Sequence, residues 1–272
     1  MTCTCLLRAL LVLAGMSMSN AMAYAQDEKL ALVIGNGAYK SEALRNPTND
    51  SRAVGQVLRS LGFGVIEREN VGFRDLIGAL REFSMRARHS QVRLLYYAGH
   101  GIQVKGRNYL IPVDAEIADA EDLPRNSADL NDLLDRFGDL RSGVNVVILD
   151  ACRNNPFNYV TITSNDGRRV RVRAPSSAQG LARTEPPSGT LIAYSTAPGA
   201  IAVDSGSESN SIYTRHLLAN FSTPGQTVEQ LFKKVRKGVA TETKNMQVPW
   251  EASSLMGDYC FSLGSGGRCG SD

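Results

Sequence analysis

The chain has 272 residues, a length that suits one large domain or two small ones. Hydrophobic residues make up 43% of it and charged residues 21%, which is ordinary for a globular protein. The formal net charge is only +3, so the overall charge gives no argument for a nucleic-acid partner.

Residues 1–25 are typical of a secretory signal peptide. Arg8 precedes an apolar run at 9–16, and alanines at 21, 23 and 25 form Ala-x-Ala cleavage sites. The alternative is a membrane anchor, but the run is far shorter than the roughly 20 apolar residues that a span requires. We therefore expect an exported protein, periplasmic or secreted, whose mature form has no membrane span.

Apolar strands alternate with amphipathic helices along the first half of the chain. The pattern predicts strands at 30–34, 63–66, 92–97 and 144–149, helices at 47–61, 73–88 and 128–140, and a hairpin arm at 109–113. Strands that alternate with helices indicate a parallel sheet with helices on both faces. The sequence therefore predicts an α/β fold.

The second half begins with a long polar segment, 154–187, which we interpret as a loop. It holds the turn sequence Asn165-Asp166-Gly167 and the arginines Arg168, Arg169, Arg171, Arg173 and Arg183. A strand at 190–196, helices at 213–221 and 228–240, and a short edge strand at 248–250 follow. A Gly/Ser-rich tail, 259–272, ends the chain.

Two apolar strands are each followed by a reactive side chain. His100 comes after the strand at 92–97, and Cys152 comes after the strand at 144–149. Ligands and catalytic groups collect at the carboxyl ends of strands in open α/β sheets. The two residues therefore form a candidate cysteine nucleophile with its base. The alternatives are a buried structural thiol and a histidine in a turn.

These segments resemble the caspase-like cysteine peptidases, in particular their bacterial, metacaspase-like (orthocaspase) branch. In that family a His-Gly follows one strand and a Cys follows the next, roughly 50 residues later. Here His100 precedes Cys152 by 52 positions. The sequence Asp150-Ala151-Cys152-Arg153-Asn154 keeps the Cys of the animal signature Gln-Ala-Cys-Arg-Gly but replaces its Gln and Gly.

The resemblance implies a three-layer αβα fold with a mostly parallel six-stranded sheet. It predicts one caspase-like peptidase domain at 27–258. That domain is divided into a catalytic part (29–153), a basic intersubunit-type loop (154–188) and a smaller C-terminal part (189–258).

The resemblance also assigns roles. Cys152 would attack a peptide carbonyl as the thiolate, and His100 would take its proton and later protonate the leaving amine. Gly101 has no Cβ, so its N–H can approach a developing oxyanion closely, and the Cys152 N–H is the second donor. The expected function is an exported cysteine endopeptidase. The alternative is a non-catalytic caspase-fold interaction module, although such relatives typically lack the His or the Cys.

Asp150 stands where the animal enzymes carry the Gln of their signature, a position that lines the S1 pocket in that family. A carboxylate there favours Arg or Lys at P1 through charge-assisted hydrogen bonds. Ser195 and Asp204, near the end of the strand at 190–196, are further substrate-binding candidates, and Asp204 is equally an ordinary loop residue. Arg45 lies where animal caspases bind an acidic P1, but a surface role is favoured because Asp150 would compete. Arginines in 154–187 are candidate sites of self-cleavage.

No cofactor or metal is expected. An acidic stretch, comprising Asp114, Glu116, Asp119, Glu121 and Asp122, has no recognised calcium-loop spacing, so a solvated loop is favoured over calcium binding. Cys260 and Cys269 flank a flexible segment, and the sequence leaves open whether they form a disulfide. The expected partner is a protein or peptide substrate, while the natural substrate and the oligomeric state are not given by the sequence.

Overall fold

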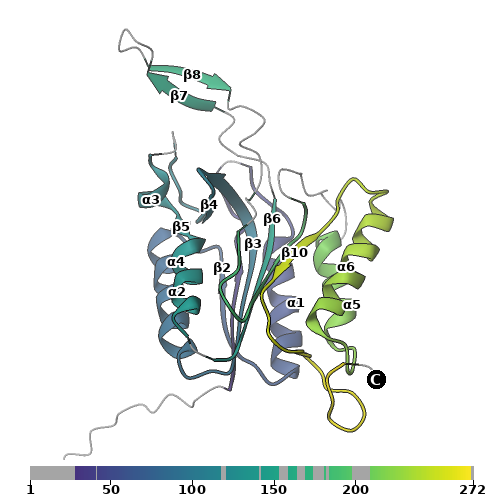
Figure 1. The fold of residues 1–272 in the computed structure, drawn as a ribbon. Coiled ribbons are helices and arrows are strands. Elements are labelled where there is room, and N and C mark those ends of the chain that lie inside the picture. Colours follow the sequence, from purple (N-terminus) through teal and green to yellow (C-terminus); the bar gives the residue numbers. More distant parts are fainter. Residues whose placement is uncertain are drawn as a thin grey trace, which may run out of the picture.

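The computed structural model describes residues 28–40, 42–117, 121–140, 142–152, 159–163, 169–173, 181, 184–197 and 209–270. Its centre is an eight-stranded sheet whose continuous path runs β10-β9-β6-β3-β1-β2 (Figure 1). The six strands of this path are β1 (Lys29–Gly35), β2 (Gly64–Glu69), β3 (Val92–Val104), β6 (Val144–Cys152), β9 (Thr190–Tyr194) and β10 (Trp250–Ser253). All neighbours on the path are parallel except β9 and β10, so the predicted mostly parallel six-stranded sheet is confirmed.

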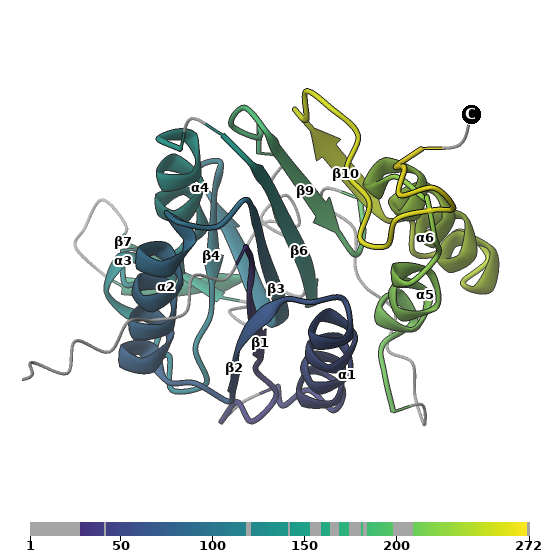
Figure 2. The same cartoon turned by 90° about the horizontal axis from the view of Figure 1, so that it is seen from below.

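Helices cover both faces of this sheet, as Figures 1 and 2 show. The helices α1 (Pro47–Ser60), α5 (Ile212–Phe221) and α6 (Val228–Glu242) lie on one face, and α2 (Phe73–Ala87) and α4 (Leu130–Gly138) lie on the other. The alternation of side chains along β1 explains the layers. Leu30, Leu32 and Ile34 pack toward α2 and α4, while Ala31 and Val33 pack toward α1 and α5. Because both faces are covered, the strand is apolar throughout.

The strand β3 is longer than the pattern predicted. It continues through His100 to Val104, because its last residues pair antiparallel with β4 (Arg107–Leu110). A two-residue strand, β5 (Ala128–Asp129), pairs in turn with β4, so α4 begins at Leu130 rather than at 128. The Asp129 side chain caps α4 by accepting a hydrogen bond from the Asn131 N–H at 2.9 Å. A short helix, α3 (Leu123–Asn126), precedes β5.

The segment 154–187 was predicted as a loop, and this is wrong in part. Two antiparallel strands, β7 (Tyr159–Thr163) and β8 (Arg169–Arg173), form a separate hairpin within it. The sequence Arg-Val-Arg-Val-Arg alternates with a period of two, and Asn-Asp-Gly stands between the two strands, which is the usual signal for a hairpin. The density of arginines masked this alternation in the sequence.

The C-terminal segment, residues 259–270, packs against the start of α6, where the Val228 N–H donates to the Tyr259 oxygen at 2.7 Å. Cys260 and Cys269 are joined in a disulfide, which settles the alternative that the sequence left open. Among the described residues, no helix combines the length and the apolar character that crossing a membrane requires. Residues 1–27, which include the expected signal peptide, lie outside the described residues.

Candidate active site

His100 and Cys152 are neighbours in the sheet. They form the last register pair of the parallel ladder between β3 and β6. Adjacent strands lie about 4.8 Å apart, so the two backbones are side by side. The sequence reasoning therefore placed both residues at one edge of the sheet, although His100 lies within the extended β3 rather than after it. The Cys152 side chain lies outside the part of the chain that the structure describes.

The ring of His100 is buried and held from one side. Its Nε2 lies 2.7 Å from the main-chain oxygen of Glu42. A carbonyl can only accept, so Nε2 carries a proton and Nδ1 is the unprotonated nitrogen of the neutral ring. Nδ1 is buried without a hydrogen-bond partner among the described residues. Burial lowers the pKa of His100, and the contact with Glu42 opposes this shift. The ring is therefore arranged as a base whose accepting nitrogen is Nδ1.

Gly101 is tightly packed against Leu181 and Ala151. A Cβ at this position would lie 3.0 Å from Cδ2 of Leu181 and 3.2 Å from Cβ of Ala151. In the antiparallel ladder Gly101 pairs with Leu110, one position from the hydrogen bond between the Ile111 N–H and the His100 oxygen. By alternation the Gly101 N–H faces the β6 side. Cys152 lies on this side, where an N–H that stabilises an oxyanion has to point. The oxyanion role of Gly101 stays a prediction.

Asp150 is buried two residues before Cys152, beside the start of α5. Its Oδ2 accepts hydrogen bonds from Ser211 Oγ at 2.5 Å and from Thr214 Oγ1 at 2.9 Å. Ser211 is also the N-cap of α5 and accepts from the Thr214 N–H at 2.9 Å. Burial raises the pKa of Asp150, and the hydrogen bonds from the two hydroxyls lower it. The carboxylate is therefore fixed in place with no cation beside it among the described residues.

A second buried carboxylate, Asp50, lies close to Asp150, and the sequence reasoning missed it. Its Oδ1 accepts from Asn210 Nδ2 at 2.8 Å and from the Ser211 N–H at 3.0 Å. Burial, followed by the charge of Asp150, raises the pKa of Asp50 to about 8. The sequence 47–50 was interpreted only as a helix start, where an acidic residue is ordinary.

Tyr96 joins the same buried cluster from β3. Its hydroxyl shares a hydrogen bond with Thr214 Oγ1 at 2.7 Å. The pKa of Tyr96 is raised by burial and further by the charges of Asp50 and Asp150. The three side chains come from α1, β6 and β3, so the cluster sits at the carboxyl end of the sheet beside the Cys152 backbone.

The other predicted substrate-binding residues have mixed outcomes. Ser195 is buried, and its hydroxyl is close enough to Asp150 to favour the ionised carboxylate, although it does not meet hydrogen-bond geometry. Asp204 lies outside the described residues. Arg45 is exposed, as the sequence reasoning favoured.

The acidic stretch has structural partners. Asp114 Oδ1 accepts from the Phe73 N–H at 2.8 Å at the start of α2, and Glu116 pairs with Lys40 at 3.2 Å. Asp119 lies outside the described residues. Within the described ranges, no three His, Cys, Asp or Glu side chains are grouped to hold a metal ion.

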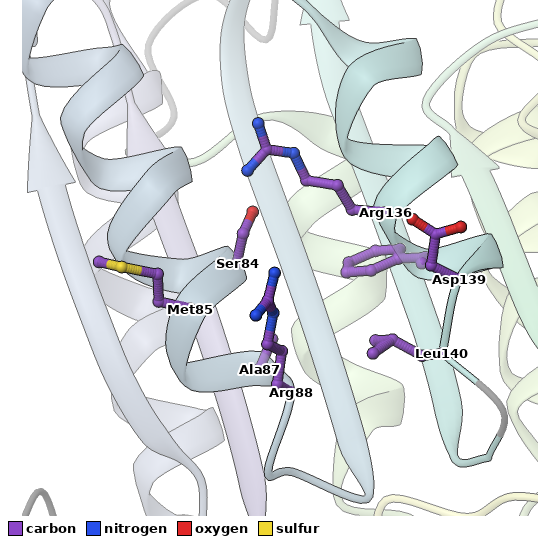
Figure 3. Close-up of a pocket in the computed structure, with 8 residues that line it drawn as sticks. Ser84, Met85, Ala87, Arg88, Arg136, Asp139 and Leu140 are labelled. Atoms are coloured by element: carbon purple, nitrogen blue, oxygen red, sulfur yellow. The ribbon is translucent and has the colours of Figure 1, made fainter.

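A separate pocket of about 450 Å³ lies between the last turns of α2 and α4 (Figure 3). It is lined by Ser84, Met85, Ala87, Arg88, Arg136, Phe137, Asp139 and Leu140. The helix α2 ends at Ala87 and β3 begins at Val92, so this pocket is at the amino end of the strands. None of the candidate catalytic or substrate-binding residues lines it.

The chain is similar in sequence to a known protein family and to two known proteins. The caspase domain (Peptidase_C14) matches residues 28–260. Over 144 residues the chain is 32% identical to the mucosa-associated lymphoid tissue lymphoma translocation protein 1 of Homo sapiens and to its homolog of Mus musculus. The alignment covers 53% of this chain and 17% of each relative, so the chain spans only a small part of their length.

Proposed function

The chain belongs to the caspase domain family, and we propose that it is an exported cysteine endopeptidase that cleaves after Arg or Lys. The observation that carries this proposal is one juxtaposition. His100 and Cys152 are register partners at the carboxyl end of the sheet, and Asp150, two residues before Cys152, interacts with a second buried carboxylate, Asp50. A protein or peptide is the substrate.

The proposed mechanism begins with proton transfer from the Cys152 thiol to Nδ1 of His100. The free Nδ1 supports this role, because the main-chain oxygen of Glu42 keeps the other ring proton on Nε2. The thiolate attacks the peptide carbonyl, and the N–H groups of Gly101 and Cys152 stabilise the oxyanion. The imidazolium then protonates the leaving amine, and water hydrolyses the acyl-enzyme with His100 as base.

Asp50 and Asp150 support a basic P1 residue. Burial, and then the nearby charge of Asp150, make an ionised Asp50 unfavourable and raise its pKa to about 8. A guanidinium or ammonium group between them would neutralise both and form charge-assisted hydrogen bonds. An acidic P1 side chain would add a third negative charge. Arg45 is exposed, so it does not supply a buried positive charge for an acidic P1 side chain.

Export is supported by two features. Residues 1–25 have the pattern of a cleaved signal, and the disulfide between Cys260 and Cys269 is the kind of bond that persists in oxidising compartments. After removal of the signal the chain keeps Cys152, Cys260 and Cys269, so Cys152 is the cysteine outside this disulfide. N-terminal sequencing of the protein recovered from cell fractions tests this part: an uncleaved cytosolic product contradicts it.

Self-cleavage in 154–187 follows from the same specificity. This segment holds five arginines, three of them in β8, and its neighbour β6 carries the nucleophile. Mass spectrometry of purified wild-type and Cys152→Ala proteins tests it. Fragments that end at these arginines should form in the wild type alone, and equal cutting in both proteins contradicts self-cleavage.

The decisive experiment uses the chain without its first 25 residues and three fluorogenic peptides that differ only in Arg, Lys or Asp at P1. Wild type should cleave the Arg and Lys peptides. Cys152→Ala and His100→Ala should each lose at least about 10³-fold in kcat, with unchanged circular dichroism. Turnover retained by folded Cys152→Ala rejects the nucleophile, and preference for Asp at P1 rejects the acidic pocket. A folded wild type without turnover favours the interaction module.

A further inference from the structure

Tyr39, in the loop after β1, contacts both the main chain and the ring of His100. The two ring centroids are 4.3 Å apart with an angle of 48° between the planes. The Tyr39 hydroxyl accepts a hydrogen bond from the His100 N–H at 2.8 Å. A single side chain therefore touches His100 at two points, and Tyr39 itself is buried.

This hydroxyl takes the place of a bond in the sheet. The ladder between β3 and β4 pairs Gly101 with Leu110, so the next pair in the same register is His100 with Ile111. One of its two bonds is present, from the Ile111 N–H to the His100 oxygen at 3.1 Å. In place of the reciprocal bond, the Tyr39 hydroxyl accepts from the His100 N–H and donates to the Ile111 oxygen at 3.1 Å.

A second tyrosine holds the other side of the same peptide. The Tyr97 hydroxyl donates to the His100 oxygen at 2.7 Å, and the Ile111 oxygen is a further acceptor at 2.9 Å. Both hydroxyls crowd Gly99, where a Cβ would lie 2.6 Å from Tyr39 Oη and 2.8 Å from Tyr97 Oη. Only glycine allows the two tyrosines this close to the histidine.

The loop that carries Tyr39 is itself fixed. Asn70 Oδ1 accepts hydrogen bonds from the N–H groups of Gly37 and Ala38, each at 2.9 Å. The same loop continues to Glu42, whose main-chain oxygen contacts Nε2 of His100. One pinned loop thus supplies both the ring contact and the acceptor that defines the tautomer.

We propose that Tyr39 is a positioning residue, which sets the orientation of the His100 ring for proton transfer with Cys152. The inference rests on the proposed peptidase function and adds to it a residue that touches neither substrate nor the reacting thiol. Its hydroxyl fixes the peptide of His100, and its ring packs on the imidazole. Without the hydroxyl, the position of the His100 ring relative to Cys152 becomes less well defined. Misplacement on the scale of 1 Å can cost about 100-fold in rate.

The test compares wild type with Tyr39→Phe, which keeps the aromatic ring and removes the hydroxyl. Two readouts are measured: kcat and KM on the Arg peptide, and the pH dependence of Cys152 alkylation by iodoacetamide. Cys152 is the reporter because Cys260 and Cys269 are joined. We expect kcat to fall by about 10- to 100-fold with KM within about twofold. The alkylation profile should move from that of wild type toward that of His100→Ala.

The matched control is Tyr259→Phe. That hydroxyl is also buried and has no hydrogen-bond partner within the described ranges, and it lies in the C-terminal segment. Both variants are compared at equal folded fraction, measured by thermal melting. If Tyr39→Phe lowers the melting temperature but keeps the wild-type kcat and alkylation profile, Tyr39 is only structural and the inference is overturned.

A second variant covers the case in which Tyr39→Phe does not fold. Gly99→Ala presses a Cβ against the Tyr39 hydroxyl, so it should lower kcat in the same way, and an unchanged kcat overturns the inference. The two proposals remain distinguishable. A wild type with neither turnover nor His100-dependent alkylation overturns both, whereas an active wild type matched by Tyr39→Phe overturns this one alone.

Discussion

The two ends of the central sheet bury charged side chains in opposite ways. At the amino end, Arg93 of β3 is 3% exposed and donates to four oxygens. Three are the main-chain oxygens of Ala87, Ser90 and Ser142, at 2.8, 2.6 and 3.0 Å, and the fourth is Asn145 Oδ1 at 3.1 Å. At the carboxyl end, Asp50 and Asp150 bring two acids together with no cation beside them among the described residues.

The difference separates a structural role from a binding role. The donors of Arg93 are satisfied within the protein, and they tie the end of α2 and the start of β6 to β3. The two acids accept hydrogen bonds from Asn210, Ser211 and Thr214, but burial and the charge of Asp150 still raise the pKa of Asp50 to about 8. Perturbed acids of this kind concentrate at functional sites because a bound group completes them. A cationic P1 side chain is the group that we propose for this site.

Among the changes that test this contrast, Asp150→Asn should have the largest effect. Asparagine keeps an oxygen for the hydroxyls of Ser211 and Thr214 but removes the negative charge. Loss of one partner of a buried charge pair costs about 2–5 kcal/mol, so kcat/KM for an Arg peptide should fall by about 30- to 5,000-fold. Asp75→Asn, the same change at an exposed position of α2, is the control. Equal kcat/KM in the two variants contradicts the acidic pocket.

Arg93→Met should have the opposite effect: it should lower stability and leave activity unchanged. The substitution keeps much of the apolar volume but removes the donor to the buried Ser90 oxygen and to Asn145 Oδ1, at about 1–3 kcal/mol for an unsatisfied buried group. We expect the melting temperature to fall by about 10 °C. At a temperature where the variant is fully folded, kcat on the Arg peptide should match wild type. A selective loss of kcat without a change in stability would show that the amino end is not merely structural.

The sequence was informative where the signal is local. An apolar run followed by His-Gly, and another that leads into Asp-Ala-Cys, were enough to place His100 and Cys152 on neighbouring strands. Both faces of the sheet are buried, so its strands are continuous apolar runs that can be recognised in the sequence. The prediction that His100 follows its strand was wrong, because the extension of β3 depends on pairing with β4, which a single run does not reveal.

The rest of the site depends on distant contacts. Asp50 precedes Asp150 by 100 positions, and only the packing of α1 beside α5 brings them together. The acceptor for His100 is the main-chain oxygen of Glu42, a group that every residue carries, so no side-chain pattern could mark it. The sequence pattern assigned no catalytic role to Tyr39. Its hydroxyl replaces a sheet bond that exists only once β3 and β4 have paired.

A smaller effect should appear in the pH dependence of specificity. Burial and the charge of Asp150 raise the pKa of Asp50 to about 8, so the empty site holds a proton at neutral pH. A cationic P1 favours the ionised pair, and its advantage should therefore grow as pH rises. The ratio of kcat/KM for Arg over citrulline, which cancels the titration of the dyad, should rise by about tenfold between pH 6 and 9. In Asp50→Asn the ratio should be flat, and a flat wild-type ratio contradicts the coupling.

The smallest effect is on the stability of the ligand-free protein. The folded-state pKa of Asp50, about 8, lies above its ordinary value of 3.8, so the folded protein retains a proton that the unfolded chain releases. The contribution of Asp50 to stability is therefore present below about pH 4 and is lost as pH rises through 8.

Asp50→Asn keeps the oxygen that accepts from Asn210 and Ser211, and it never ionises. Its melting temperature should match wild type near pH 4 and exceed it by a few degrees at pH 9. Asp75→Asn should show no such crossover, because that carboxylate is exposed. If Asp50→Asn is less stable than wild type at pH 9, the Asp50 carboxylate is satisfied within the protein, as Arg93 is, and the contrast between the two ends of the sheet fails.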